Sequence, residues 1–236
     1  MKTPVPAESQ SPDQPGIEML STAEAVAVEA PQLVPIYQMA FAGEPSREVS
    51  ACRAPDQFEN ACKRRRSQLG IGETCPKCGE VLQEPAFPEK ALIADWISHF
   101  NARDSRFYIE RSADGSHVVA AMAWKASARA LAKRCYTKSG EEEMHNWLPD
   151  RLPGDFVWLE DIFADLSLRS SGNLWNHRTM ILWFLSELKA TVLAFRSINE
   201  GLIEKTIRLF GPQAERLVAG EDVPDDRHLV VVRLSS

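Results

Sequence analysis

The fold of this chain is decided by one apolar stretch, Gly154-Asp155-Phe156-Val157-Trp158-Leu159-Glu160-Asp161-Ile162-Phe163-Ala164. Aromatic and β-branched residues dominate positions 156–163, which predicts a strand. Asp161 lies inside this apolar strand, where a carboxylate is costly unless it is paired or takes part in chemistry. Asp161 is therefore the first candidate for a catalytic residue. The alternative is that Glu160 or Asp161 simply faces solvent from a half-buried strand.

Regular elements flank this strand on both sides. Upstream, apolar residues recur at helical spacing over 90–101 and predict a helix. Two predicted strands follow, 106–110 and 117–124, and the turn at 112–115 joins them as a hairpin. Downstream we expect a helix over 174–188, a strand over 190–196, a helix over 200–210 and a strand over 228–234. Antiparallel strands followed by a strand–helix–strand crossover predict an α/β (α+β) fold, a mixed sheet flanked by helices.

Composition bounds the class of protein. The chain has 236 residues with 27 Lys+Arg and 33 Asp+Glu, so its net charge of -6 argues against a protein that coats nucleic acid. There is no apolar run long enough for a transmembrane helix. Polar residues follow Met1-Lys2, so we expect no secretory signal and a cytoplasmic location. In a reducing compartment, the five Cys are metal ligands or free thiols before they are disulfides.

Three regions differ in composition. Residues 1–30 are rich in Pro, Ser, Gln and acidic residues near their start, which predicts a disordered tail with at most a short helix over 22–30. Residues 31–85 hold four of the five Cys, and few large apolar residues lie between Glu44 and Glu80, so we expect a metal or a disulfide to stabilise this region. Residues 86–236 form the main domain.

Specific residues within the main domain resemble a known family. The predicted element order is that of the GNAT acyltransferase superfamily. Val119-Ala120-Ala121-Met122-Ala123-Trp124 resembles the V-A-x-x-x-W strand of the toxin-activating lysine acyltransferases, which acylate RTX toxins. Residues 154–164 resemble that family's G-D-x-x-W-x-x-D-x-x-A signature at five fixed positions. Its closing R…K…F-x-G pattern has counterparts in Arg196, Lys205, Phe210 and Gly211.

The resemblance implies a reaction. An acyltransferase of this family moves an acyl group from an acyl carrier protein, or from acyl-CoA in the wider superfamily, to a lysine of an acceptor protein. A His–Asp pair performs the acid–base work, and Asp161 aligns with the family's Asp. The chemistry requires such a pair, because a lysine is protonated near neutral pH and must lose a proton before it attacks.

The family's His has no direct counterpart. It lies in a Pro-x-His segment before the first long helix, where this chain has Pro45-Ser46-Arg47. His99 is the remaining candidate for the base, although its polar neighbours predict a position at the surface. If no His meets Asp161, the chain has changed or lost the chemistry. A catalytically inactive scaffold is therefore one alternative function.

A loop and a helix end carry further GNAT-like features. Residues 169–174 partly match the R-x-x-G-x-G/A loop that holds the pyrophosphate of acyl-CoA, which implies Arg169, Gly172 and Asn173 as cofactor-binding residues. Equally, these are ordinary loop and helix-capping residues. Phe210 stands where the superfamily often has a Tyr general acid, and since Phe cannot donate a proton we assign it to packing.

The cysteines suggest a metal site. Cys75-Pro76-Lys77-Cys78-Gly79 is typical of half a zinc knuckle, with Cys52 and Cys62 as the other two ligands. Four thiolates would make this a structural site with no open position. The alternative is free thiols with one redox-active pair. Cys135 lies in an Ala-rich helical stretch, where we expect a packed thiol.

A basic run gives another alternative function. Lys63, Arg64, Arg65 and Arg66 lie beside the predicted zinc module. The chain would then be a nucleic-acid-binding or nucleic-acid-modifying GNAT-like protein of a phage or mobile element. More often such a run is a solvated surface. For an acidic carrier protein, a local basic patch of Arg196, Lys205 and Arg208 would have to supply the contact.

Overall fold

The computed structural model describes residues 16–43, 48–51, 66–67, 70–76, 79, 81–82, 84–112, 114–115, 118–135, 138–152, 154–165, 176–219, 221 and 227–234. A seven-stranded sheet forms its centre, in the order β1-β5-β6-β7-β8-β10-β9. The strands are β1 (Gly16–Leu20), β5 (Ser105–Arg111), β6 (Val118–Ser127), β7 (Asp155–Ala164), β8 (Val192–Ser197), β9 (Ala214–Leu217) and β10 (His228–Arg233). Neighbouring strands are antiparallel except for β7 and β8, which are parallel, so the predicted mixed sheet is confirmed.

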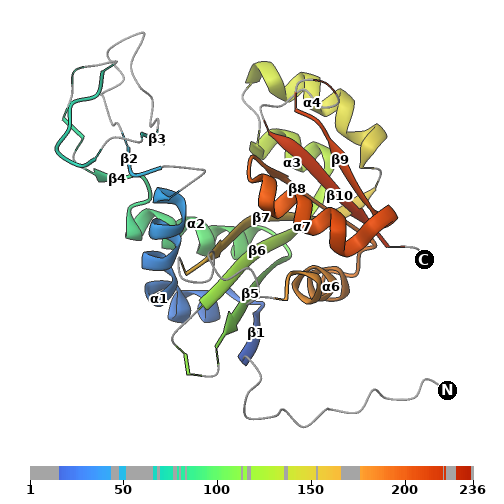
Figure 1. Cartoon of the computed structure of the whole chain (residues 1–236), viewed down its shortest axis with the longest axis horizontal. Coiled ribbons are helices and arrows are strands. Elements are labelled where there is room, and N and C mark those ends of the chain that lie inside the picture. Colours follow the sequence, from blue (N-terminus) through green and yellow to red (C-terminus); the bar gives the residue numbers. More distant parts are fainter. Residues whose placement is uncertain are drawn as a thin grey trace.

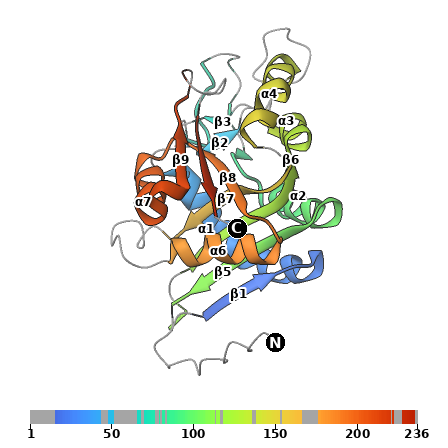
Figure 2. The same cartoon turned by 90° about the vertical axis from the view of Figure 1, so that its right-hand side faces the viewer.

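Helices cover both faces of this sheet (Figures 1 and 2). The helices are α1 (Ala23–Ala42), α2 (Glu89–Ala102), α3 (Ala128–Cys135), α4 (Lys138–Arg151), α6 (His177–Glu187) and α7 (Glu200–Phe210), with a 3₁₀ turn at Gly211–Gln213. Side chains of α6 and α7 pack on one face. On the other face, α1 and α2 pack over β5 and β6, and α3 and α4 pack over β7, β8 and β10.

The predicted elements of the main domain agree with the structure. The apolar strand is β7, the hairpin is β5 and β6, and the crossover is β7–α6–β8. Trp124 and Trp158, at 1% and 2% exposure, lie in the core beneath α3 and α4. Phe210 is also buried, under the Arg178 guanidinium, and this confirms its packing role.

Residues 16–42 correct the predicted disorder of 1–30 and the boundary at residue 31. They form the edge strand β1 and the long helix α1, whose buried side chains fill the core against α2 and β7. Pro31 and Pro35 inside α1 hide its period in the sequence, because proline is normally a helix breaker. Packing of Val26, Leu33 and Tyr37 against the sheet compensates. Residues 1–15 lie outside the described residues.

A small second sheet lies between α1 and α2 in the sequence and apart from the main sheet (Figure 1). Its strands are β2 (Ser50–Ala51), β3 (Arg66–Ser67) and β4 (Glu84–Pro85), in the order β3-β2-β4. An isolated antiparallel bridge between Thr74 and Val81 lies in the same region. Among the described residues of this region, the buried ones are Ser50, Cys75, Leu82 and Phe87.

Candidate active site

The parallel strands β7 and β8 part soon after they meet. Val157 pairs with Leu193 and Trp158 with Ala194, and these are the two pairs in register between the strands. Beyond them β7 continues to Ala164 and β8 to Ser197. In sheets with parallel strands, ligands bind beyond the carboxyl ends of the strands where the topology changes direction. The opening between β7 and β8 is that point in this sheet.

A β-bulge in β7 lies at this opening. Ala123 of β6 pairs with Leu159, and the next residue, Met122, pairs with Asp161, so Glu160 is the extra residue. A bulge turns two consecutive side chains toward the same face of a sheet. Asp161 shares the face of its partner Met122, which packs under α1 and α2. Glu160 reaches the same face, because its Oε2 accepts the indole N–H of Trp124 at 2.9 Å.

His99 and Arg103 complete this group from the end of α2. The Arg103 guanidinium carbon lies 4.9 Å from the centre of the Trp124 ring, and its Nη1 lies 3.3 Å from His99 Nδ1. Since a guanidinium only donates, Nδ1 accepts, and a neutral His99 ring carries its proton on Nε2. The His99 and Trp124 rings are 6.2 Å apart. Both predicted catalytic residues, Asp161 and His99, therefore lie on one face of the sheet.

The predicted surface position of His99 is wrong, because the residue is only 1% exposed. Leu92, Trp96 and His99 are four and three residues apart and form the buried stripe of α2. The polar residues beside His99 belong to the other faces of the helix. Its role in catalysis stays a prediction.

The predicted cofactor loop lies outside the described residues, and so do Arg169, Gly172 and Asn173. What the structure describes is the helix that follows the loop. Asn176 caps α6, with its side-chain oxygen accepting the Thr179 N–H at 3.2 Å. Assignment of these three residues to donor binding stays a prediction.

The opposite face of the sheet holds a cluster that the sequence analysis missed. Glu110 of β5 is 5% exposed, and its Oε2 accepts the Tyr108 hydroxyl at 2.7 Å and the Asn176 N–H at 3.4 Å. Burial, together with this hydrogen bond to a carboxylate, raises the pKa of Tyr108 far above its usual value. The pKa of Lys205 on α7 is lowered by burial and by Arg208, and Glu110 partly opposes that change. The sequence held one signal of this cluster, the charged residue Glu110 next to the apolar run Phe107-Tyr108-Ile109.

His177 belongs to the same cluster and stays neutral. Its Nε2 lies 2.7 Å from the Thr206 hydroxyl, and both side chains are at most 1% exposed. Burial, with a smaller contribution from the positive charge of Lys205, lowers the pKa of His177 to about 3. A proton on this ring would have no water to solvate it.

We expect this histidine to make the protein sensitive to acid. The unfolded chain takes up a proton at His177 near pH 6.5, whereas the folded chain does so only at about pH 3. Stability is therefore complete above pH 6.5 and falls as the pH is lowered between those values, by up to about 1.4 kcal/mol per pH unit. Urea unfolding measured from neutral to acidic pH tests this. The decline should be shallower in His177→Gln and unchanged in His145→Gln, a matched variant of an exposed histidine.

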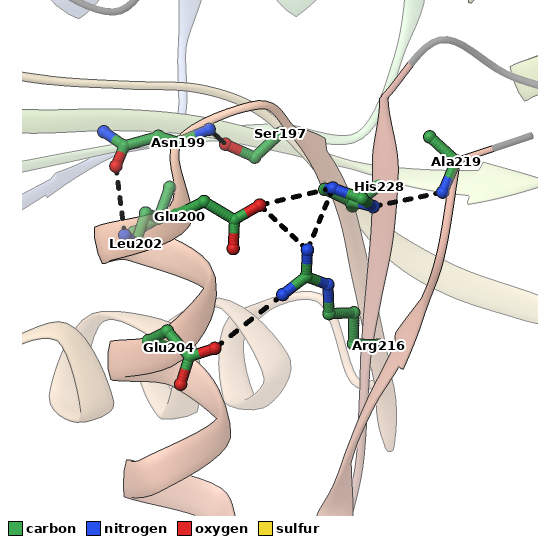
Figure 3. A network of polar contacts seen from close by, with 8 residues as sticks. All are labelled: Ser197, Asn199, Glu200, Leu202, Glu204, Arg216, Ala219 and His228. Carbon is green, nitrogen blue, oxygen red and sulfur yellow. Dashed lines mark hydrogen bonds and ion pairs between the residues drawn. The ribbon is translucent and has the colours of Figure 1, made fainter.

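A polar network ties α7 to the last two strands (Figure 3). Glu200 Oε1 accepts Arg216 Nη2 at 2.8 Å and lies 3.3 Å from His228 Nε2. The Ala219 N–H donates to His228 Nδ1 at 3.0 Å, and Arg216 Nη2 lies 2.9 Å from His228 Nε2. Both nitrogens of His228 are thus engaged. The network anchors β9 and β10 to the start of α7, and we assign it to stability.

The predicted metal site is described only in part. Cys52, Cys62 and Cys78 lie outside the described residues, and within the described ranges no three His, Cys, Asp or Glu side chains form a metal-binding group. Cys75 is buried at 6% exposure. Its carbonyl accepts the Gly79 N–H at 2.8 Å, and Gly79 has a φ of 77°, which favours glycine. The basic run is described only at the backbone of Arg66, in β3.

Zinc binding therefore stays a prediction with a direct test. Native mass spectrometry of the reduced protein should show one bound zinc ion that is lost on denaturation. Cys75→Ser and Cys78→Ser should each abolish it, since removal of one thiolate leaves an incomplete tetrahedron. Cys135→Ser is the matched control and should retain the metal. A wild-type protein that takes up no zinc under reducing conditions would contradict the prediction.

Comparison with known proteins gives the class of fold. No family profile and no curated protein matches the chain by sequence. Among solved structures it is similar to the histone acetyltransferase HPA2 and related acetyltransferase from Corynebacterium glutamicum, with a TM-score of 0.50 and 14% sequence identity. The similarity covers 94% of this chain and 98% of that chain. At this identity it shows the fold alone, a GNAT-like mixed sheet flanked by helices.

None of the helices in the described parts of the chain combines the length and the apolar character that crossing a membrane requires.

Proposed function

We propose that this protein is an acyltransferase that moves an acyl group from a thioester to an amine at the opening between β7 and β8. One observation carries the proposal: the bulge at Glu160 places two adjacent carboxylates, Glu160 and Asp161, where the parallel strands part. The GNAT-like fold supports it. A pair of carboxylates on one face attracts a positively charged acceptor. An amine carries that charge before it reacts, because it is protonated near neutral pH.

The two faces of the sheet at the opening carry different side chains, so each face binds a different substrate. The face of Glu160 and Asp161 takes the amine. The thioester donor enters from the face of α6 and α7, whose amino ends follow the two parallel strands. The acyl carbon and the amine nitrogen then meet within the opening.

The reaction balances with the groups present. Asp161 accepts a proton from the ammonium. His99, on the same face of the sheet, is the proposed acid–base partner of Asp161. The free amine attacks the thioester carbonyl, the C–N bond forms, and the C–S bond breaks. After the attack the nitrogen loses a second proton, which the departing thiolate takes up to leave as a thiol, and Asp161 releases the first proton to solvent.

The finer assignment rests on the sequence resemblance. Residues 119–124 and 154–164 resemble the toxin-activating lysine acyltransferases. They favour an acyl carrier protein over acyl-CoA as donor and a protein lysine as acceptor. Lys205 and Arg208 on α7 supply positive charge for an acidic carrier, and they interact with each other electrostatically.

The test is incubation with a panel of fatty acyl-carrier-protein and acyl-CoA thioesters, with and without a lysine-containing acceptor protein. Thiol release and intact mass report turnover and acylation. Release from either donor, coupled to a mass gain on the acceptor, is the expected result. An absence of thiol release and of donor binding across the panel would overturn the proposal in favour of an inactive scaffold.

A further inference from the structure

A buried polar contact joins the two helices that follow the parallel strands. α6 follows β7 and α7 follows β8, and both pack on the same face of the sheet through apolar side chains. Within this apolar contact, His177 at the start of α6 meets Thr206 in the middle of α7. Both are fully buried, at 1% and 0% exposure.

In the hydrogen bond between His177 and Thr206, the histidine is the donor. The Thr206 hydroxyl donates its only proton to the Leu202 carbonyl at 2.8 Å, so its oxygen accepts from His177 Nε2–H at 2.7 Å. His177 has a pKa of about 3, so this neutral tautomer persists across the neutral pH range. The hydrogen bond therefore holds one relative placement of the two helices.

The same end of α6 is held from a second side. The Asn176 N–H donates to Glu110, which also accepts the Tyr108 hydroxyl, and this attaches α6 to β5. A buried hydrogen bond adds little net stability compared with apolar packing of the same volume. Two such contacts at one helix end are better explained by a need for exact placement than by a need for stability.

We propose that His177 and Thr206 are positioning residues that set the separation of α6 and α7 at the side of the opening where the thioester donor enters. This inference rests on the proposed function. The pair does not touch the reacting atoms. It fixes the relative placement of the two helices, so that a thioester entering beside their amino ends meets helices that need no reorganisation on binding.

The test is a comparison of KM for donor and acceptor in variants of this pair. Thr206→Val keeps the shape but removes the hydroxyl, and we expect the donor KM to rise about tenfold while kcat and the acceptor KM stay near wild type. His177→Gln keeps an N–H group that can donate a hydrogen bond to Thr206, so this variant should retain most of the wild-type affinity for the thioester. Thr179→Val, the same substitution in the first turn of α6, is the matched control and should leave both constants unchanged.

Each outcome decides between the inferences. A purely structural role would lower the active fraction, and hence kcat, without a selective change in the donor KM. Equal changes in both KM values, or unfolding of both Thr206→Val and His177→Leu, would overturn the positioning role. A wild-type protein that turns over no thioester would instead overturn the proposed function itself.

Discussion

Asp161→Asn is expected to lower the rate of acyl transfer about 100-fold or more, with little change in stability. The amide keeps the size of the side chain but cannot take a proton from the acceptor ammonium. Asp161 lies at the bulge and is only partly buried, so the substitution creates neither a cavity nor a buried charge. Thiol release from the preferred donor, measured with saturating acceptor, gives the rate.

Asp155→Asn is the matched control for this prediction. Asp155 begins the same strand, its side chain is 64% exposed, and its ion pair with Lys125 at 3.7 Å is a surface contact. The control should retain wild-type turnover. If Asp161→Asn were as active as Asp155→Asn, the proton acceptor would have to be a different group, and Glu160 would be tested next.

Tyr37→Ala is expected to reduce the free energy of unfolding by about 3–5 kcal/mol, the cost of truncating a buried aromatic residue. Tyr37 of α1 is 4% exposed, and its ring centre lies 4.4 Å from Phe41, 4.9 Å from Phe87 and 5.0 Å from Phe163. These neighbours belong to α1, the segment before α2, and β7. The substitution therefore tests whether α1 belongs to the core of the main domain. Denaturant unfolding monitored by tryptophan fluorescence measures the change.

Val28→Ala separates this effect from a loss of helix propensity. Val28 lies on the same helix but is 72% exposed, so its truncation should change stability by no more than about 0.5 kcal/mol. If Tyr37→Ala behaved like Val28→Ala, the helix would not contribute to the core, and residues 16–30 would belong to the disordered tail that their composition predicts.

Most of the sheet was predictable because its signals are local. The apolar run of 156–163, the turn of the hairpin and the helical spacing of 90–101 each depend on residues close together in the chain. β1 and α1 escaped prediction because their stability is not local. The partner of β1 is β5, whose residues are about ninety positions away, as in the pair Gly16 and Arg111. Two prolines also obscure the period of α1.

The sequence by itself determined the mixed sheet, the crossover that makes β7 and β8 parallel, and the presence of Asp161 in an apolar strand. Only the tertiary structure decided which face that carboxylate occupies. Strand alternation would place Glu160 and Asp161 on opposite faces, and the bulge, which exists only in the pairing of β7 with β6, places both on one. Burial of His99 and the contact of His177 with Thr206 were likewise decided by helix packing, because they join residues that no local spacing relates.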